Sequence, residues 1–141
     1  MQFAVVLGSL FALASASAID TRAEYPACGP TTGGLYLPEA VTRGQAFPVR
    51  FCSDTYAKTS SKSITFALNP LAEKNVNGAI ILSDELTSAG GKQYDFEATV
   101  PETLDLSGNV FFAVVEKIND YYVDSSYAVH WTNINVNAPS A

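Results

Sequence analysis

The sequence contains little of the chemistry from which most active sites are built. Its 141 residues include one histidine and two cysteines. It lacks the GxSxG turn of serine hydrolases, the HExxH helix of zinc peptidases, the phosphate-binding loop and the dinucleotide glycine pattern. Each of these motifs has a spacing that its chemistry requires, so their absence argues against those enzyme classes. We therefore expect a protein that is not an enzyme and that carries no metal or cofactor.

Basic residues are also scarce. Eight Lys and Arg are scattered among 14 Asp and Glu, which leaves a net charge of −6. Nucleic acids and anionic membrane surfaces are bound by concentrated basic side chains, so neither is an expected partner. Beyond the N-terminus no apolar run is long enough to span a bilayer, and no membrane insertion is expected.

The one long apolar run lies at the N-terminus. It extends from Phe3 to Ala14 and is followed by the small-residue ending Ala16-Ser17-Ala18. A short apolar core before such an ending is typical of a secretory signal peptide. We therefore expect residues 1–18 to be removed and the remaining chain to be secreted and extracellular. The Gly- and Pro-rich segment 19–34 is interpreted as an N-terminal arm, and residues 35–141 as one domain.

Both cysteines lie beyond the signal segment. In an oxidising compartment Cys28 and Cys52 are predicted to form a disulfide. Closing this loop would stabilise the fold by about 3 kcal/mol in the chain-entropy model. The predicted bond would fasten the arm to a strand of the domain.

The rest of the chain alternates apolar and polar residues in twos, which is typical of half-buried strands. About seven such segments occur, separated by turn-rich stretches, and no long amphipathic helix is visible. They cover residues 34–38, 47–52, 63–69, 78–83, 93–100, 109–117 and 126–136. The pattern predicts an all-β fold, an immunoglobulin-like antiparallel β-sandwich. In the last segment the apolar parity changes between Trp131 and Ile134, which predicts a β-bulge or a turned strand.

Two places could still carry chemistry. With Trp131 facing the core, His130 would face solvent, where a lone histidine is expected to be inert. Asp95 and Glu97 share the outer face of one strand, with side chains about 7 Å apart. That separation suits an inverting glycosidase, so a small hydrolase remains an alternative. The favoured interpretation is an ordinary solvated strand face.

The segment Asp120-Tyr121-Tyr122-Val123-Asp124 is predicted to form the tip of the last hairpin. Tyrosine offers a large contact area at a low entropic cost, so this tip is the first binding surface to test. A calcium loop that also uses Asn119 is a second interpretation. A third is that one tyrosine folds back onto the domain.

Several phrases of the sequence resemble a known family. They are "LYLPEAVTRGQAFPVRF", "SITFAL", "YDFEATVPETLDLSGNVFFAVVEKI" and "YAVHWTNINV", within Leu35 to Val136. Together they resemble the necrosis-inducing secreted protein family of fungi. The resemblance implies a fungal effector that binds host receptor-associated kinases, suppresses plant immunity and acts inside or outside host cells. It supplies no catalytic residue, and the cysteine pair has no match in it.

The Val100-Pro101 phrase with Gly108 also resembles the yeast cell-wall glucan-assembly proteins. This second resemblance implies the alternative function, a cell-wall glycan-binding or structural β-sandwich protein.

Overall fold

The computed structural model describes residues 25–29, 33–54, 60–71, 74, 77–88, 92–119 and 125–139. The expected signal segment 1–18 and most of the arm lie outside these residues. Within them the chain is all-β, with no helix of the length and apolarity that a membrane crossing requires. The strands are β1 (Gly34–Tyr36), β2 (Ala40–Thr42), β3 (Ala46–Cys52), β4 (Ser60–Asn69), β5 (Ile80–Leu86), β6 (Gln93–Thr99), β7 (Gly108–Asn119) and β8 (Ser126–Asn137).

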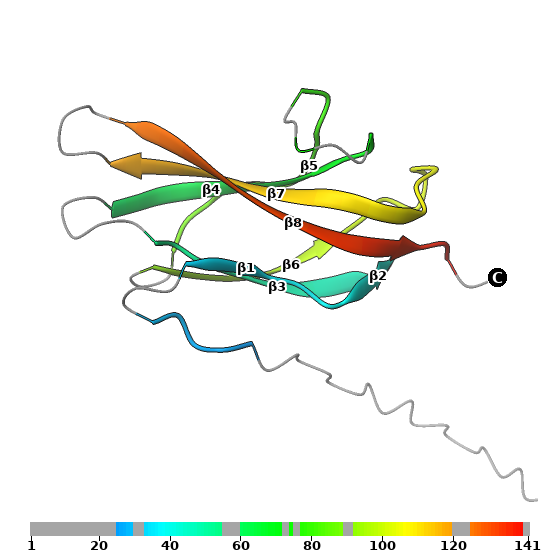
Figure 1. Cartoon of the computed structure of the whole chain (residues 1–141), viewed down its shortest axis with the longest axis horizontal. Coiled ribbons are helices and arrows are strands. Elements are labelled where there is room, and N and C mark those ends of the chain that lie inside the picture. The colour runs from blue at the N-terminus through cyan, green and yellow to red at the C-terminus, as the bar shows by residue number, and fades with distance from the viewer. Residues whose placement is uncertain are drawn as a thin grey trace, which may run out of the picture.

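The strands form two stacked sheets (Figure 1). One has three strands in the order β1-β3-β6, and the other has five in the order β2-β8-β7-β4-β5. Every neighbouring pair is antiparallel except β2 and β8, which run parallel. The predicted immunoglobulin-like β-sandwich is confirmed. Strand β2 was not predicted from the sequence.

Alternation places one side of each predicted strand in the core. Phe47 and Phe51 of β3 are buried, as are Phe66 of β4 and Phe112 of β7. The rings of Phe66 and Phe112 stack with centroids 5.5 Å apart, and Phe47 meets Phe112 edge-on at 6.1 Å. Burying a side chain of this size stabilises the fold by about 1.5–3 kcal/mol. Contacts between the two layers therefore hold the sandwich together.

Strand β8 corrects one prediction. Its pairing with β7 continues without a register shift from Val136 to Ser126, so the expected β-bulge is absent from this ladder. Tyr127 and Val129 are 66% and 41% exposed, whereas Ile134 and Val136 are buried. The parity never changes. The outer face of this strand simply carries apolar residues, which were mistaken for a core-facing set.

The predicted disulfide between Cys28 and Cys52 is present, with Cα atoms 5.4 Å apart. It joins the arm to the last residue of β3. Tyr25 adds a second attachment, because its hydroxyl donates a 3.0 Å hydrogen bond to the carbonyl of Pro48.

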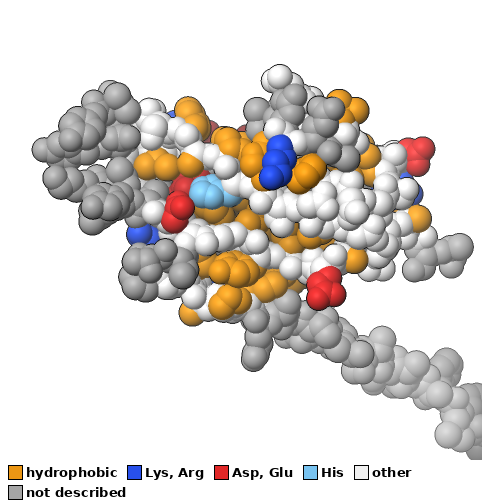
Figure 2. Space-filling view, viewed as in Figure 1, with side chains coloured by type: hydrophobic (Ala, Val, Ile, Leu, Met, Phe, Trp, Pro, Cys, Tyr) orange, Lys and Arg blue, Asp and Glu red, His pale blue; other side chains and the backbone are white. Residues whose placement is uncertain are grey.

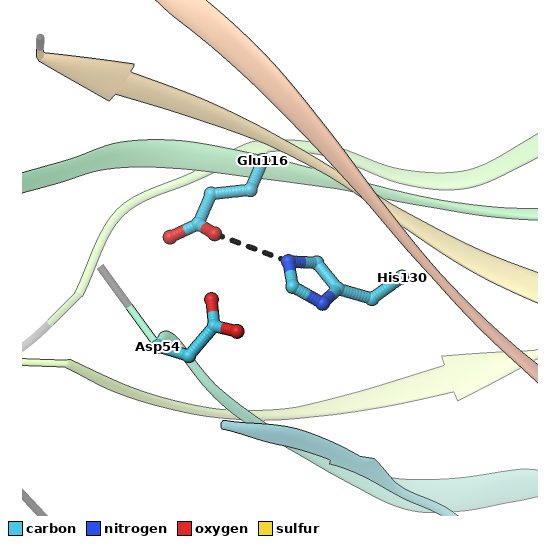
Figure 3. A group of neighbouring side chains, drawn as sticks. All are labelled: Asp54, Glu116 and His130. Carbon is cyan, nitrogen blue, oxygen red and sulfur yellow. Dashed lines mark hydrogen bonds and ion pairs between the residues drawn. The ribbon is translucent and has the colours of Figure 1, made fainter. Parts of the chain in front are cut away.

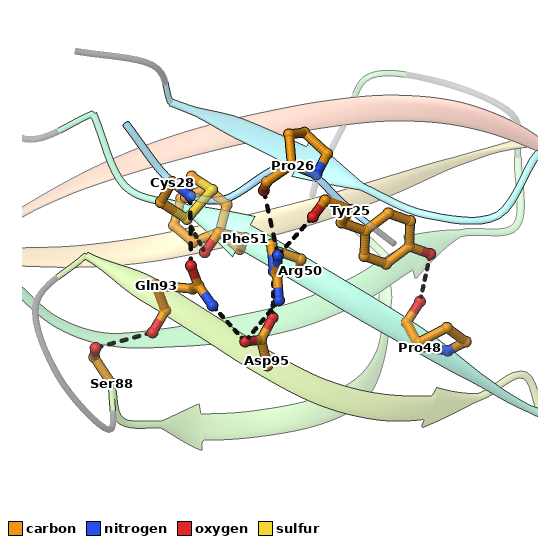
Figure 4. Close-up of polar contacts among 10 residues, drawn as sticks. Tyr25, Pro26, Cys28, Pro48, Arg50, Phe51, Ser88, Gln93 and Asp95 are labelled. Carbon is orange, nitrogen blue, oxygen red and sulfur yellow. Dashed lines mark hydrogen bonds and ion pairs between the residues drawn. A yellow bond between two sulfur atoms is a disulfide. The ribbon is translucent and has the colours of Figure 1, made fainter. Parts of the chain in front are cut away.

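Arg50 forms a further link between the arm and the three-stranded sheet (Figure 4). Its Nη1 donates to the carbonyls of Tyr25 and Pro26, at 2.8 and 3.3 Å. Its Nε and Nη2 donate to the two oxygens of Asp95, at 2.6 and 3.1 Å. One guanidinium thus binds the arm and the neighbouring strand β6 together.

Candidate functional site

A buried carboxylate and the only histidine of the chain meet on the inner face of the five-stranded sheet. Glu116 lies on β7 in phase with the core residues Phe112 and Val114. His130 of β8 pairs with Val114 in the ladder, so it lies diagonally across from Glu116. The His130 Nε2 and Glu116 Oε2 atoms are 3.3 Å apart (Figure 3). The Glu116 side chain is fully buried and that of His130 is 22% exposed.

Asp54 completes this group from the opposite layer. It is exposed and lies two residues after the end of β3, in the chain that leaves the three-stranded sheet. One side-chain donor atom from each of Asp54, Glu116 and His130 lies within 4.8 Å of the other two. In the space-filling view the histidine, in pale blue, reaches the surface beside acidic side chains in red (Figure 2). We call these three residues the acid–imidazole cluster.

The backbone at Asp54 is fixed from two sides. Cys52, two residues earlier, is bonded to the arm through the disulfide. Gly33 packs directly on Asp54, since a Cβ at residue 33 would lie 2.4 Å from the Asp54 Cβ. Only glycine allows this approach, because the Cβ of any other residue is fixed by the backbone and cannot rotate away from the contact. The arm and the disulfide together hold Asp54 in the cluster.

The electrostatics of the cluster favour a charged pair. Burial alone would raise the pKa of Glu116. The net pKa is lowered, because hydrogen bonds from His130, Ser53 and Ser61 and the charge of His130 outweigh the effect of burial. The hydrogen bond to Glu116 raises the pKa of His130, burial opposes this, and the charges of Glu116 and Asp54 raise it further. The ionised forms of both groups are therefore stabilised.

The two oxygens of the buried Glu116 carboxylate differ in their hydrogen bonding. Among the described residues, no hydrogen bond of normal geometry reaches Glu116 Oε1. The Ser53 and Ser61 side chains nevertheless contribute to the lowered pKa of this carboxylate. The Ser61 hydroxyl shares a 2.5 Å hydrogen bond with the Tyr94 hydroxyl. An unsatisfied oxygen on a buried charge is costly and calls for an explanation.

Tyr94 and Phe51 enclose the cluster on its inner side. Burial raises the pKa of Tyr94. The hydrogen bond to Ser61 opposes this increase, and the charge of Glu116 adds to it. The Phe51 ring lies between, 5.9 Å from the Tyr94 ring and 4.9 Å from the His130 ring. The cluster thus has an apolar floor and is open to solvent at Asp54 and His130.

The prediction that His130 faces solvent was wrong. Trp131 occupies the outer face, where its ring meets that of Phe111 edge-on at 6.4 Å, so His130 faces inward. Two signals pointed to this site. His130 is in phase with Ile134, and Glu116 continues the inward phase of the most apolar strand. A charge in that position indicates a buried partner.

Of the other candidate residues, the structure describes the carboxylates Asp95 and Glu97. Asp95 is bound by Arg50 and also accepts from the Gln93 amide at 2.6 Å. A guanidinium favours the ionised carboxylate, which is the opposite of what a general acid needs. Asp95 and Glu97 line a shallow open hollow on the outer face of the three-stranded sheet. The predicted tip 120–124 lies outside the described residues.

The outer face of the five-stranded sheet carries an apolar surface. Trp131 pairs with Ala113, Ala113 with Ala67, and Ala67 with Ile81, so four apolar residues lie side by side across β8, β7, β4 and β5. Val129 lies two residues from Trp131 on the same face of β8 and pairs with Val115. We call this surface the apolar belt; its members are Ala67, Ile81, Ala113, Val115, Tyr127, Val129 and Trp131.

Comparison with known proteins supports the fold alone. No protein-family model and no curated protein matches the chain. Among solved structures, the chain is similar to superoxide reductase (neelaredoxin) from Ignicoccus hospitalis. The match has a TM-score of 0.51 and 14% sequence identity, and it covers 75% of this chain and 80% of that one.

Proposed function

We propose that this protein is a secreted, non-enzymatic binding protein and that the apolar belt is its contact surface. The observation that carries this proposal is the row of paired apolar residues from Trp131 to Ile81 across four strands. Its two central alanines, Ala67 and Ala113, are buried, whereas Ile81, Tyr127 and Val129 are 59%, 66% and 41% exposed. Exposed apolar side chains gathered on one face of a domain are typical of interaction sites.

The composition of the belt favours a protein partner. Its exposed positions include the aliphatic residues Ile81 and Val129, and its centre is formed by the small residues Ala67 and Ala113. The belt also carries the aromatic residues Tyr127 and Trp131, and aromatic residues are enriched at protein–protein interfaces. Lys117 pairs with Tyr127, so one basic side chain borders the belt.

The resemblance to the necrosis-inducing secreted proteins supplies the proposed partner. It points to a host receptor-associated kinase, and hence to a fungal effector that suppresses plant immunity. The N-terminal signal segment supports export, and the disulfide fits an oxidising compartment. Delivery into host cells is part of the same proposal.

The test uses the secreted chain from residue 19 and purified kinase domains of host immune receptors. One variant carries Ile81→Thr, Tyr127→Ser and Val129→Thr, which remove exposed apolar groups and keep strand-compatible residues. The matched control is Leu71→Ser, because Leu71 is 68% exposed and lies in the turn after β4, off the belt. We expect the triple variant to lose kinase binding and the control to retain it. If the folded triple variant binds the kinase as the wild type does, the belt is not the contact surface.

A second set of variants tests the tip predicted from the sequence. Changing Tyr121 and Tyr122 to Ala should leave binding intact if the belt is the contact surface. If the Tyr121 and Tyr122 variant loses binding and the triple variant does not, the tip is the contact surface in place of the belt.

A cell-wall glycan is the second candidate partner. Tyr127 and Trp131 lie on the same face of β8, and aromatic rings in such a row can stack on sugars. Co-sedimentation with chitin, cellulose or β-glucan that is lost in Tyr127→Ser would favour this function over kinase binding.

A further inference from the structure

We propose that the acid–imidazole cluster is a binding site for a divalent transition metal of the Zn²⁺ class. Asp54, Glu116 and His130 are its three protein ligands, and the fourth position is open to solvent. The proposal stands on different residues from the apolar belt and is independent of the proposed function. It also departs from the expectation, drawn from the sequence, that the protein carries no metal.

The distances in the cluster are close to those of a tetrahedral site. Ligand atoms about 2.0–2.1 Å from Zn²⁺ lie about 3.3 Å from one another in a tetrahedron. The His130 Nε2 and Glu116 Oε2 atoms are already 3.3 Å apart. The donor atoms of all three residues lie within 4.8 Å, so closure requires only a small movement. Asp54 can supply it, because its side chain is exposed and rotates about its own χ angles.

The surplus carboxylate oxygen is the second observation that points to a ligand. Glu116 is fully buried, yet within the described chain its Oε1 atom makes no hydrogen bond. Asp54 brings a second carboxylate toward it across the gap between the layers (Figure 3). Two carboxylates and one imidazole therefore converge on a partly dry site, where a cation would compensate the excess negative charge.

The donor set selects the class of metal. Mg²⁺ and Ca²⁺ prefer six or more oxygen ligands, which this cluster does not offer. One imidazole nitrogen with two carboxylates suits Zn²⁺ and related first-row ions. Three protein ligands and an open position are typical of an accessible Zn²⁺ centre. The Ser53 and Ser61 hydroxyls are close enough to orient the Glu116 carboxylate, as outer hydrogen-bonding groups do in metal sites.

Because the chain has one histidine, metal binding can be followed at one known residue. The protein is prepared from residue 19 without a histidine tag, stripped with a chelator and titrated with Zn²⁺ in a calorimeter. The same titration is followed by NMR, where all imidazole signals come from His130. We expect one equivalent of Zn²⁺ to bind and the imidazole signals to shift with the same stoichiometry. Absence of binding, or binding that leaves the imidazole signals in place, overturns the proposal.

Asp54→Asn is the decisive variant, because Asp54 is exposed and its loss leaves the core intact. Its matched control is Asp105→Asn, an exposed acid in the segment between β6 and β7. We expect Asp54→Asn to weaken Zn²⁺ binding by at least about tenfold, which is the smallest effect usual for groups that support a metal site. The control should bind like the wild type. Equal affinities of the two variants, or Ca²⁺ binding as tight as that of Zn²⁺, reject the site.

Discussion

Gly33 of the arm and Asp54 at the end of β3 are in direct contact, and a Cβ on Gly33 would lie 2.4 Å from the Cβ of Asp54. The two residues are far apart in sequence and come together because β1 pairs with β3, with Gly34 opposite Cys52, and the Cys28–Cys52 disulfide ties the arm to the same end of β3. The position of one exposed carboxylate is therefore set by a glycine and a covalent bond. Both can be changed without touching the acid–imidazole cluster itself.

Gly33→Ala should move Asp54 away from His130. The added Cβ meets another Cβ and not the flexible end of a side chain, so backbone must shift to relieve the clash. Overpacking of this kind costs about 1–3 kcal/mol. Urea unfolding should show that loss, and Zn²⁺ titration should show weaker binding than in the wild type.

A double-mutant cycle identifies the cause. In an Asp54→Gly background the Cβ that Gly33→Ala would meet is gone, so the same substitution should cost much less stability. Independent effects of the two changes would mean that they do not act through this contact.

The His130–Glu116 pair should make the metal-free protein most stable in mildly acidic solution. The pKa of His130 is raised above 6.5, so its contribution is complete below that pH and is lost as the pH rises through the folded-state pKa. The pKa of Glu116 is lowered below 4.5, so its contribution is present above that pH and is lost on strong acidification. Both contributions are complete between these limits.

His130→Gln measures the first of these contributions. Hydrogen bonds between charged groups contribute about 1.5–3 kcal/mol, so the variant should be less stable by that order near pH 5.5. The difference should shrink as the pH rises through the raised pKa of His130, where the wild-type imidazole loses its proton. Denaturant unfolding with a chelator present gives both values. A difference that does not change with pH would assign the loss to packing against Phe51 instead.

Removing the disulfide should weaken the fold and the cluster together. Cys28→Ala with Cys52→Ala reopens a loop with a sequence separation of 24 and should cost about 3 kcal/mol. Zn²⁺ affinity should also fall in the still-folded protein, because Asp54 lies just beyond Cys52. Thermal unfolding and calorimetric titration test the two effects separately. Full Zn²⁺ affinity in the double variant would show that Asp54 is positioned without the arm.

Arg50→Lys should loosen the arm and leave the sandwich intact. Lysine cannot bind both oxygens of Asp95 and also reach the carbonyls of Tyr25 and Pro26. The ion pair is surface-exposed, so its loss should cost no more than about 1 kcal/mol. Limited proteolysis should cleave the arm faster than in the wild type. Lys117→Arg on β7, in the opposite sheet, is a suitable control, and it should leave the cleavage rate unchanged.

The sequence was informative wherever one face of a strand is apolar and the other polar. Alternation in β3, β4 and β6 located the core, and the two cysteines identified the disulfide. Alternation failed in β8, because both faces of that strand carry apolar residues and the exposed set is the larger. His130 was consequently assigned to the wrong side of the sheet.

The acid–imidazole cluster could not be assembled from sequence spacing. Asp54 belongs to one layer, whereas Glu116 and His130 belong to the other, and only the stacking of the sheets brings them together. Periodicity within a strand gives the face on which a residue lies. It gives no information about which residue of the opposite sheet will lie across from it.

Taken with the proposed export and the proposed metal site, the link between the disulfide and Asp54 implies a maturation sequence. A newly made chain with reduced cysteines would have Glu116 and His130 in place but an unsecured third ligand. Oxidation along the export route would complete the cluster, so metal loading would follow folding and would occur after the chain has left the reducing interior of the producing cell. The redox state of one bond would thereby determine where the protein can compete for metal.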